Sequence, residues 1–143
     1  GLFREADVIF PEDNLYDRYQ AGEHYDVIIA DEAQFFTPEQ IDQLRQIVDE
    51  ADLPVLCFGL RTDFLTHLFP GSRRLMELAD SITEIKTVCA CGSKATVNAR
   101  LDASGTILTT GSQVFLGGND SYVAMCHRCW RKKIQAQQKS NLN

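Results

Sequence analysis

The first half of the chain contains two short, continuous apolar runs separated by an amphipathic segment. The runs are residues 25–30 (YDVIIA) and 54–59 (PVLCFG). Unbroken apolar runs of this length are typical of strands that are buried on both faces of a parallel sheet. We therefore predict two parallel strands here.

The segment between the runs predicts a helix. Thr37 can cap its N-terminus, with Pro38 at the first helical position and Gln40 completing a capping box. The apolar residues that follow share one helical face: Ile41, Leu44, Ile47 and Val48. Strand, helix and strand together form a βαβ unit, which predicts a right-handed crossover.

The pattern changes after residue 88. Before it, residues 73–78 predict a short helix and residues 81–88 a third strand. After it, short alternating segments separated by turn residues predict a small antiparallel lobe, at 95–101, 113–116 and 121–125. We accordingly divide the chain into an α/β part (1–88), a lobe (89–131) and a polar C-terminal tail (132–143) that we expect to fray.

Composition narrows the class of protein. The chain is 44% hydrophobic and 24% charged, as expected of a soluble globular protein. Its net charge of -6 disfavours nucleic acid as a partner, because binding the phosphate backbone needs a basic surface. No apolar run approaches the roughly 18 residues of a membrane span. The first residues lack the features of a signal peptide, and we expect them to come from the middle of a protein.

Four of the five cysteines form two close pairs, Cys89/Cys91 and Cys126/Cys129, with 34 residues between the pairs. Two such knuckles can present four thiolates to one structural zinc ion. A lobe of roughly 40 residues also has too small a core to be stable without a cross-link. Because the first pair has an unusual one-residue spacing, His127 stays an alternative ligand. Reduced core cysteines are the other interpretation.

An acidic pair follows the first predicted strand. Asp31 and Glu32 lie at its carboxyl end, where ligands bind in α/β sheets. An apolar strand that ends in Asp is the Walker B pattern, in which the Asp helps to hold the Mg²⁺ of a nucleotide. The adjacent Glu can accept a proton from a nucleophile. A helix N-cap or a solvated turn is the alternative.

Two further segments are candidates to face a ligand. Residues 59–64 (GLRTDF) follow the second predicted strand, again at a carboxyl end. Residues 117–122 (GGNDSY) contain paired glycines, which let backbone amides approach a ligand closely. Taken alone, the second segment is better explained as a hairpin turn, and Phe64 and Phe69 are equally well explained as core residues.

In this order, the runs DEAQFF, GLRTDF, CACG, GGNDSYV and CHRCW resemble the type II thymidine kinases, over residues 25–130. The resemblance implies a RecA-like α/β core with a parallel sheet, plus a zinc-held lobe whose long loop, the lasso, closes over thymidine. It implies transfer of the γ-phosphoryl group of ATP, with Mg²⁺, to the 5′-hydroxyl of thymidine. It also implies a cytoplasmic homotetramer that serves nucleotide salvage, with zinc as the structural metal.

Site residues carry over motif by motif. Glu32 resembles the general base and Asp31 the Mg²⁺-associated acid, with Ala33 and Gln34 beside them at the cofactor. The residues that match the thymidine site are Phe35, Leu60, Phe64 and Phe69 in the base pocket, Asn98 near the base, Gln113, Phe115 and Gly117 in the lasso, and Tyr122 after it. The four paired cysteines match the zinc ligands.

The most important departure of the chain from the family is an absence. It contains no G-x-x-x-x-G-K-[ST] sequence, the loop that holds the phosphates of ATP. We expect the parent enzyme to be a kinase, and this chain by itself, lacking that loop and its strand, to be inactive. A helicase-like ATPase fragment would share the Asp-Glu-Ala motif but needs basic strand-binding surfaces. A nucleic-acid-binding zinc module would explain residues 89–129 but not the βαβ unit.

Overall fold

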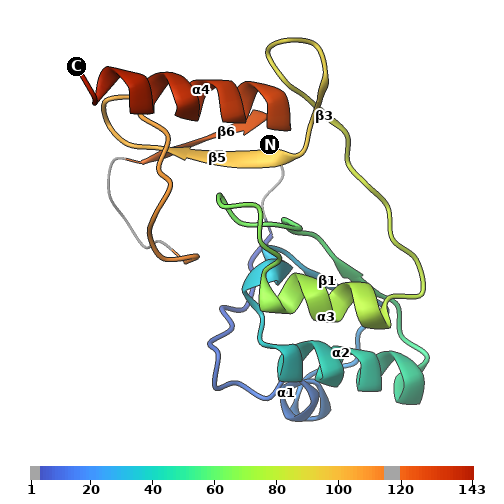
Figure 1. Cartoon of the computed structure of the whole chain (residues 1–143). Coiled ribbons are helices and arrows are strands. Elements are labelled where there is room, and N and C mark those ends of the chain that lie inside the picture. The colour runs from blue at the N-terminus through green and yellow to red at the C-terminus, as the bar shows by residue number, and fades with distance from the viewer. Residues whose placement is uncertain (1–3, 115–119) are drawn as a thin grey trace. The chain divides into compact units, whose positions relative to one another are not determined.

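The computed structural model describes residues 4–114 and 120–143 of the chain (Figure 1). Contacts divide the chain into two compact units. The first comprises Gly1–Gly59 and Pro70–Ala79, and the second comprises Leu60–Phe69 and Asp80–Asn143. The loop at 60–69 therefore belongs with the cysteine-containing half of the chain, although the sequence on both sides of it belongs to the first unit.

The first unit is a parallel strand pair with helices. Its elements are α1 (Leu15–Ala21), β1 (Ile28–Ala30), the 3-10 helix η1 (Ala33–Phe35), α2 (Pro38–Ala51), β2 (Val55–Cys57) and α3 (Pro70–Leu78). β1 and β2 pair in parallel, with Ile28 opposite Val55 and Ala30 opposite Cys57. The predicted strand–helix–strand unit and the α/β class are thus confirmed, although both strands are shorter than predicted.

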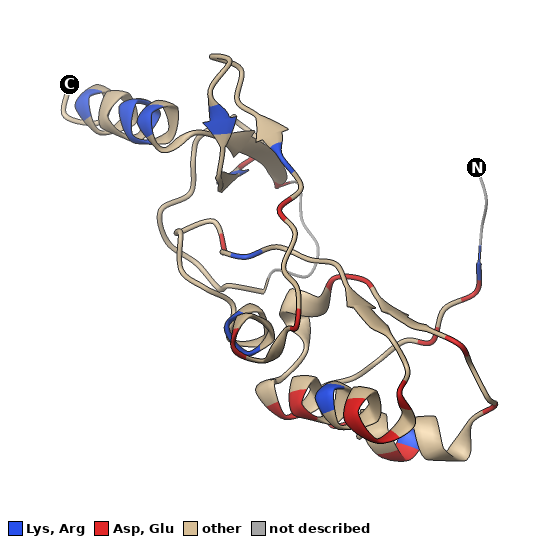
Figure 2. Ribbon diagram, turned by 90° about the vertical axis from the view of Figure 1, so that its right-hand side faces the viewer, with Lys and Arg blue, Asp and Glu red and all other residues tan. Residues whose placement is uncertain are grey.

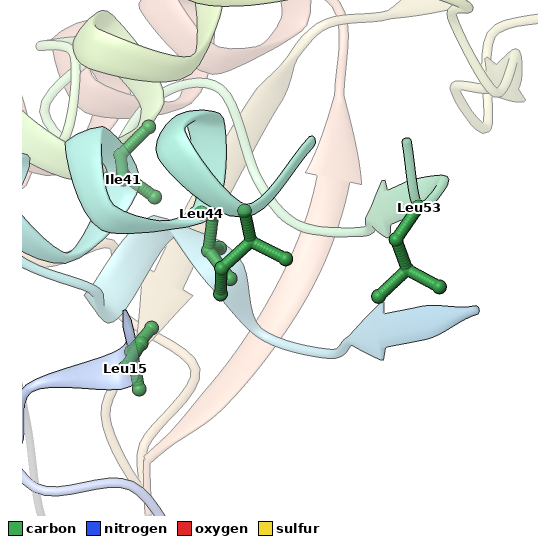
Figure 3. Close-up of a cluster of buried hydrophobic side chains, with 5 residues drawn as sticks. Leu15, Ile41, Leu44 and Leu53 are labelled. Atoms are coloured by element: carbon green, nitrogen blue, oxygen red, sulfur yellow. The ribbon is translucent and has the colours of Figure 1, made fainter. Parts of the chain in front are cut away.

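The core of the first unit lies between its helices and one face of the strand pair. The buried residues that form it are Leu15, Ile41, Leu44, Ile47 and Leu53 (Figure 3). Ile28, Val55 and Cys57 of the strands pack against this cluster. Burial of large aliphatic side chains is worth roughly 1.5–3 kcal/mol each, so this cluster stabilises the unit.

The other face of the strand pair is not buried, contrary to prediction. Successive residues of a strand point to opposite faces, and Ile29 is 65% and Leu56 48% exposed. Among the described residues, helices pack on only one face of the strand pair, so the side chains on the other face stay exposed. The apolar composition of the two runs still indicates strands that are suited to burial on both faces.

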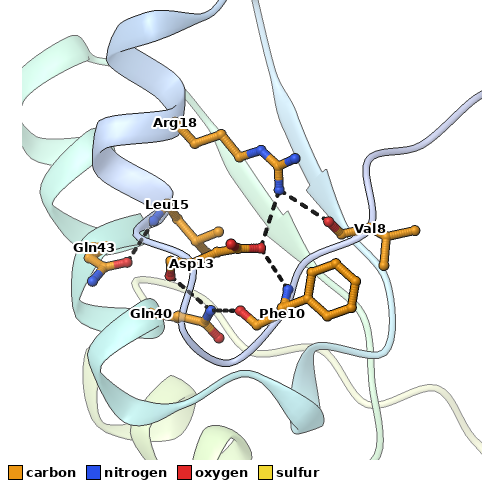
Figure 4. Close-up of polar contacts among 7 residues, drawn as sticks. All are labelled: Val8, Phe10, Asp13, Leu15, Arg18, Gln40 and Gln43. Atoms are coloured by element: carbon orange, nitrogen blue, oxygen red, sulfur yellow. Dashed lines mark hydrogen bonds and ion pairs between the residues drawn. The ribbon is translucent and has the colours of Figure 1, made fainter.

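Residues near the start of α2 form hydrogen bonds with the segment at residues 10–15. Thr37 and Gln40 form the predicted capping box, which is confirmed. The Gln40 amide also donates to the carbonyl oxygens of Phe10 (2.8 Å) and Asp13 (3.0 Å) (Figure 4). The backbone N–H of Leu15 donates to Gln43 at 2.7 Å. Gln40 is 2% exposed, and these bonds compensate for the burial of its polar amide.

The second unit contains two antiparallel strand pairs and a helix. Its elements are β3 (Thr87–Val88), β4 (Lys94–Ala95), β5 (Val97–Leu101), β6 (Ser121–Met125) and α4 (His127–Ser140). β3 pairs with β4, and β5 pairs with β6 over five residues, from Val97 opposite Met125 to Leu101 opposite Ser121. The predicted antiparallel character of this part is confirmed.

Three sequence-based predictions for this unit need correction. The strand predicted at 81–88 is reduced to β3, because residues 81–86 find no partner strand among the described residues. Residues 113–114 are not in a strand, and 115–116 lie outside the described residues. The tail predicted to fray forms most of α4. Its Lys, Gln and Ala residues are good helix formers, and Gln137 exchanges hydrogen bonds with the backbone of Ile107.

Charge is unevenly distributed along the chain (Figure 2). The α4 sequence HRCWRKKIQAQQKS contains five Lys or Arg residues and no acidic residue. In contrast, α2 carries four acidic residues and one Arg. A search of the described helices finds none with the length and apolar character of a membrane span.

Candidate functional site

The acidic pair lies where β1 ends. β1 stops at Ala30, and the next two residues, Asp31 and Glu32, are exposed. The Asp31 carboxylate accepts a hydrogen bond from the backbone N–H of Glu32 at 2.9 Å. Glu32 has a left-handed backbone with φ of 51°. Such a conformation costs a non-glycine residue on the order of 1 kcal/mol and is concentrated at functional sites.

The turn that contains the acidic pair is tied to β2. The backbone N–H of Phe58 donates to Ala30, and that of Ala33 donates to Phe58, both at 2.9 Å. Because these two bonds continue the parallel pairing past the end of β1, the position of the turn is fixed relative to the sheet.

Two glycines allow close packing around η1. A Cβ atom at Gly59 would lie 2.5 Å from Oε1 of Gln34. One at Gly71, in the first turn of α3, would lie 2.4 Å from the carbonyl oxygen of Phe36 and 2.8 Å from that of Gln34. Gly71 has no space for a side chain, because the atoms that block it belong to the backbone. A side chain at Gly59 would displace the end of the Gln34 side chain, so both glycines favour the observed packing of η1.

The residues after the acidic pair differ in accessibility. Ala33 is fully buried and Gln34 is 2% exposed, whereas Phe35 is 47% exposed. The Gln34 amide donates a hydrogen bond to the carboxylate of Glu32. Among the four predicted cofactor residues, the two acids are therefore presented to solvent. Ala33 and Gln34 lie beneath them, and Gln34 orients Glu32.

The second unit contains the predicted base-pocket loop. Phe64 and Phe69 are buried, with 2% and 4% exposure, and Leu60 is exposed. One carboxylate oxygen of Asp63 accepts from the backbone N–H groups of Leu65 (2.9 Å) and His67 (3.0 Å). These bonds close the loop into a compact turn, because they satisfy amides that no strand or helix pairs.

Arg100 lies at the centre of this part of the structure and is not among the residues predicted from the sequence. Arg100 is 2% exposed, and its guanidinium carbon lies 4.0 Å from the centre of the Phe64 ring. Its Nε donates to the Tyr122 hydroxyl at 2.9 Å, and Nη1 donates to the carbonyl oxygen of Ser112 at 3.0 Å. The alternation of side chains along a strand could have indicated Arg100, because it lies two residues after the predicted site residue Asn98 and therefore on the same face of β5.

Gln113 is the predicted lasso residue that the structure describes, and it contacts the loop at 60–69. The Gln113 amide donates to Asp63 at 2.9 Å and to the carbonyl oxygen of Leu68 at 3.3 Å. Asn98 donates to the carbonyl oxygen of Thr62 at 3.4 Å. The structure thus brings Phe64, Asn98, Gln113 and Tyr122 together around Arg100 and Asp63. Phe115 and Gly117 lie outside the described residues.

The four paired cysteines form one cluster. Sγ atoms of Cys89, Cys91, Cys126 and Cys129 all lie within 4.8 Å of one another. The β3–β4 turn presents the first pair, with the backbone N–H of Cys89 donating to Ser93 at 2.8 Å. The second pair lies at the start of α4, which Cys126 caps. Among the described residues, His127 is not part of this group.

The cluster fits a tetrahedral metal ion. The Sγ atoms of Cys91 and Cys126 are 3.7 Å apart, and four sulfurs at the Zn–S distance of about 2.3 Å would be roughly 3.8 Å apart. A hydrogen bond from the Ser93 side chain lowers the pKa of Cys91 to about 6. Hydrogen bonding with Cys126 and the other cysteines raises the pKa of Cys129 to about 12. The pKa values of Cys91 and Cys129 are therefore shifted in opposite directions, whereas a bound cation favours the thiolate form of each ligand.

These features define an α/β protein with an acidic pair after a parallel strand and a four-cysteine site that can hold a metal ion such as zinc. Comparison with known proteins narrows this class. The family model described as "Thymidine kinase" matches residues 5–130, which is most of the chain. The chain belongs to the thymidine kinase family.

Curated relatives agree with this assignment. The chain is 48% identical over 136 residues to a thymidine kinase of Ruegeria pomeroyi, a match that covers 92% of the chain and 68% of the relative. It is 52% identical over 120 residues to one of Yersinia pseudotuberculosis (81% and 61%) and 44% identical over 137 residues to one of Shewanella oneidensis (94% and 71%). The chain thus spans about two thirds of the length of these relatives.

Proposed function

We propose that the protein containing this chain is a thymidine kinase, which transfers the γ-phosphoryl group of ATP to the 5′-hydroxyl of thymidine and yields thymidine monophosphate and ADP. The family match over residues 5–130 carries this proposal. The exposed acidic pair at the end of a parallel strand supports it, because this position suits a nucleotide and its metal ion. The first unit is then part of a RecA-like core.

Glu32 is the proposed general base. In its exposed position, it can accept the proton of the 5′-hydroxyl as that oxygen attacks phosphorus. The hydrogen bond from Gln34 supports this role, because it limits the rotation of the carboxylate. Asp31 would help to hold Mg²⁺, which neutralises phosphate charge when bound with ATP. Most of the catalysis then comes from positioning and charge neutralisation.

The proposed thymidine site includes the loop at 60–69 and the face of β5 that carries Asn98. The cluster of Phe64, Asn98, Gln113 and Tyr122 supports this assignment, because predicted thymidine-site residues from four separate segments lie together. Phe35, Leu60, Phe69, Phe115 and Gly117 stay predicted contacts. Buried rings such as Phe64 provide apolar walls for a flat base, and neighbouring amides provide specificity.

The four-cysteine cluster is proposed to hold one structural zinc ion. Four thiolates close the coordination shell and leave no position for substrate, which indicates a structural rather than a catalytic metal. When bound, zinc would connect the β3–β4 turn to the start of α4. Assembly as a homotetramer, a cytoplasmic location and inactivity of this 143-residue chain on its own stay predictions.

The proposal is tested by incubating the complete protein with ATP, Mg²⁺ and labelled thymidine and measuring thymidine monophosphate. The nucleic-acid alternative has one observation in its favour, the basic sequence of α4. Titration with single-stranded and duplex DNA at physiological salt distinguishes the two. Thymidine phosphorylation without DNA binding supports the kinase. DNA-stimulated ATP hydrolysis without phosphorylation of thymidine would overturn it.

A further inference from the structure

We propose that Arg100 is a positioning residue for thymidine binding: it holds the ring of Phe64, the hydroxyl of Tyr122 and the main chain at Ser112 in one arrangement. This inference rests on the proposed function of the second unit. Arg100 contacts segments that are distant in sequence, namely the loop at 60–69, the backbone at residues 112–113, and β6.

The contacts of Arg100 explain why a cation is tolerated at a position that is only 2% exposed. A buried charge requires hydrogen-bond acceptors or aromatic faces that compensate for lost hydration. The guanidinium lies over the Phe64 ring at 4.0 Å and has the Tyr122 ring centre 5.4 Å away. Its N–H groups donate to Tyr122 and to the carbonyl oxygens of Ser112 and Gln113.

Lysine cannot reproduce this arrangement. The guanidinium is planar and points its N–H groups in fixed directions, so it can stack on one ring while it donates in its own plane to several acceptors. A lysine ammonium is a compact charge that cannot stack in the same way. The three-segment contact therefore depends on the shape of the Arg100 side chain as well as on its charge.

The position of Arg100 links it to substrate binding. Three of its neighbours, Phe64, Gln113 and Tyr122, are predicted thymidine contacts, and Asn98 shares its strand face. Asp63 holds Gln113 through the side-chain amide, while Arg100 holds the adjacent backbone. Loss of Arg100 would leave these residues present but free to move apart. The expected consequence is weaker thymidine binding, with less effect on ATP, whose proposed ligands Asp31 and Glu32 belong to the first unit.

The test uses the complete protein with Arg100→Met and Arg100→Lys. Arg131→Met, which removes an exposed cation from α4, is the matched control. Steady-state kinetics give kcat and the KM values for thymidine and ATP, while circular dichroism and zinc content check folding. We expect Arg100→Met to raise the thymidine KM about tenfold or more, with the ATP KM within about twofold of the unmutated value. Arg100→Lys should rescue only part of the loss, and the control should change neither KM.

Tyr122→Phe tests the same inference without removing the buried cation. It deletes the oxygen that accepts from Nε of Arg100, and we expect a rise in thymidine KM of about threefold or more. Because Tyr122 is itself a predicted thymidine contact, a rise in this variant supports the inference only if Arg100→Lys also raises the thymidine KM. If Arg100→Met does not fold, these two variants together decide the matter. Unchanged thymidine KM in Tyr122→Phe, or in a folded Arg100→Met protein, would overturn the inference, as would equal increases for thymidine and ATP. If the unmutated protein does not phosphorylate thymidine at all, the proposed function itself has failed.

Discussion

The side-chain amide of Gln34 donates a hydrogen bond to the carboxylate of Glu32, so a buried residue holds an exposed acid two positions earlier in the chain. The two residues differ in burial: Gln34 is 2% exposed, whereas Glu32 is exposed to solvent. The turn itself is fixed by backbone bonds to Phe58 and by the close approach of Gly59 and Gly71. The proposed general base, Glu32, is thus positioned by buried residues of the turn that it belongs to.

Gln34→Ala should therefore lower kcat more than it changes the thymidine KM. Without the amide, the Glu32 carboxylate rotates more freely, and loss of positioning should cost on the order of tenfold in kcat. Steady-state kinetics of the complete protein measure this. Gln46→Ala, which removes an exposed amide from α2, is the control. Unchanged kcat in Gln34→Ala would show that Glu32 needs no such support.

Gly71→Ala should destabilise the protein. The added Cβ would lie 2.4 Å from the Phe36 carbonyl oxygen and 2.8 Å from that of Gln34, and these backbone atoms cannot move without disturbing η1. We expect the free energy of unfolding to fall by about 1–3 kcal/mol, as for other overpacked sites. Urea unfolding of the complete protein measures it, with Arg73→Ala on the exposed side of α3 as control. A midpoint equal to that of the control would contradict this packing.

Zinc content should depend on the cysteines and not on His127. Elemental analysis of the complete protein should find about one zinc ion per chain. Cys126→Ser should lose most of it, because Cys126 lies 3.7 Å from Cys91 within the cluster. His127→Ala should keep a full complement, because His127 is outside the cluster. Loss of zinc in His127→Ala would reverse the ligand assignment.

Local signals in the sequence predicted some elements well. The capping box of Thr37 and Gln40 lies within four residues, and α2 begins where it indicates. The alternation at 121–125 likewise corresponds to β6. The members of each cysteine pair are close in sequence, with Cys89 and Cys91 on the β3–β4 turn and the second pair at the start of α4, and the two pairs together predicted the cluster. In the helix cap, the strand and each cysteine pair, the residues that decide the local structure are close together in sequence.

Other features depend on partners that are distant in sequence. Residues 81–88 have strand-like composition, but a strand also needs a partner, and only Thr87 and Val88 find one, in β4. The helical tail was missed because its polar sequence does not show the contact between Gln137 and Ile107. Arg100 was missed because an arginine is ordinarily exposed. Its burial follows from Phe64 and Tyr122, which approach it from other segments.

The most direct test of the central claim is the comparison of Glu32→Gln with Glu39→Gln in the complete protein, using ATP, Mg²⁺ and labelled thymidine. Both changes remove one carboxylate and keep the shape of the side chain, but Glu39 is an exposed residue in the first turn of α2. We predict that the unmutated protein and Glu39→Gln form thymidine monophosphate at similar rates. Glu32→Gln should lose on the order of 10²-fold or more in kcat, as expected for a lost general base. Equal kcat in the two variants would contradict the role of Glu32, and no thymidine monophosphate from the unmutated protein would contradict the function.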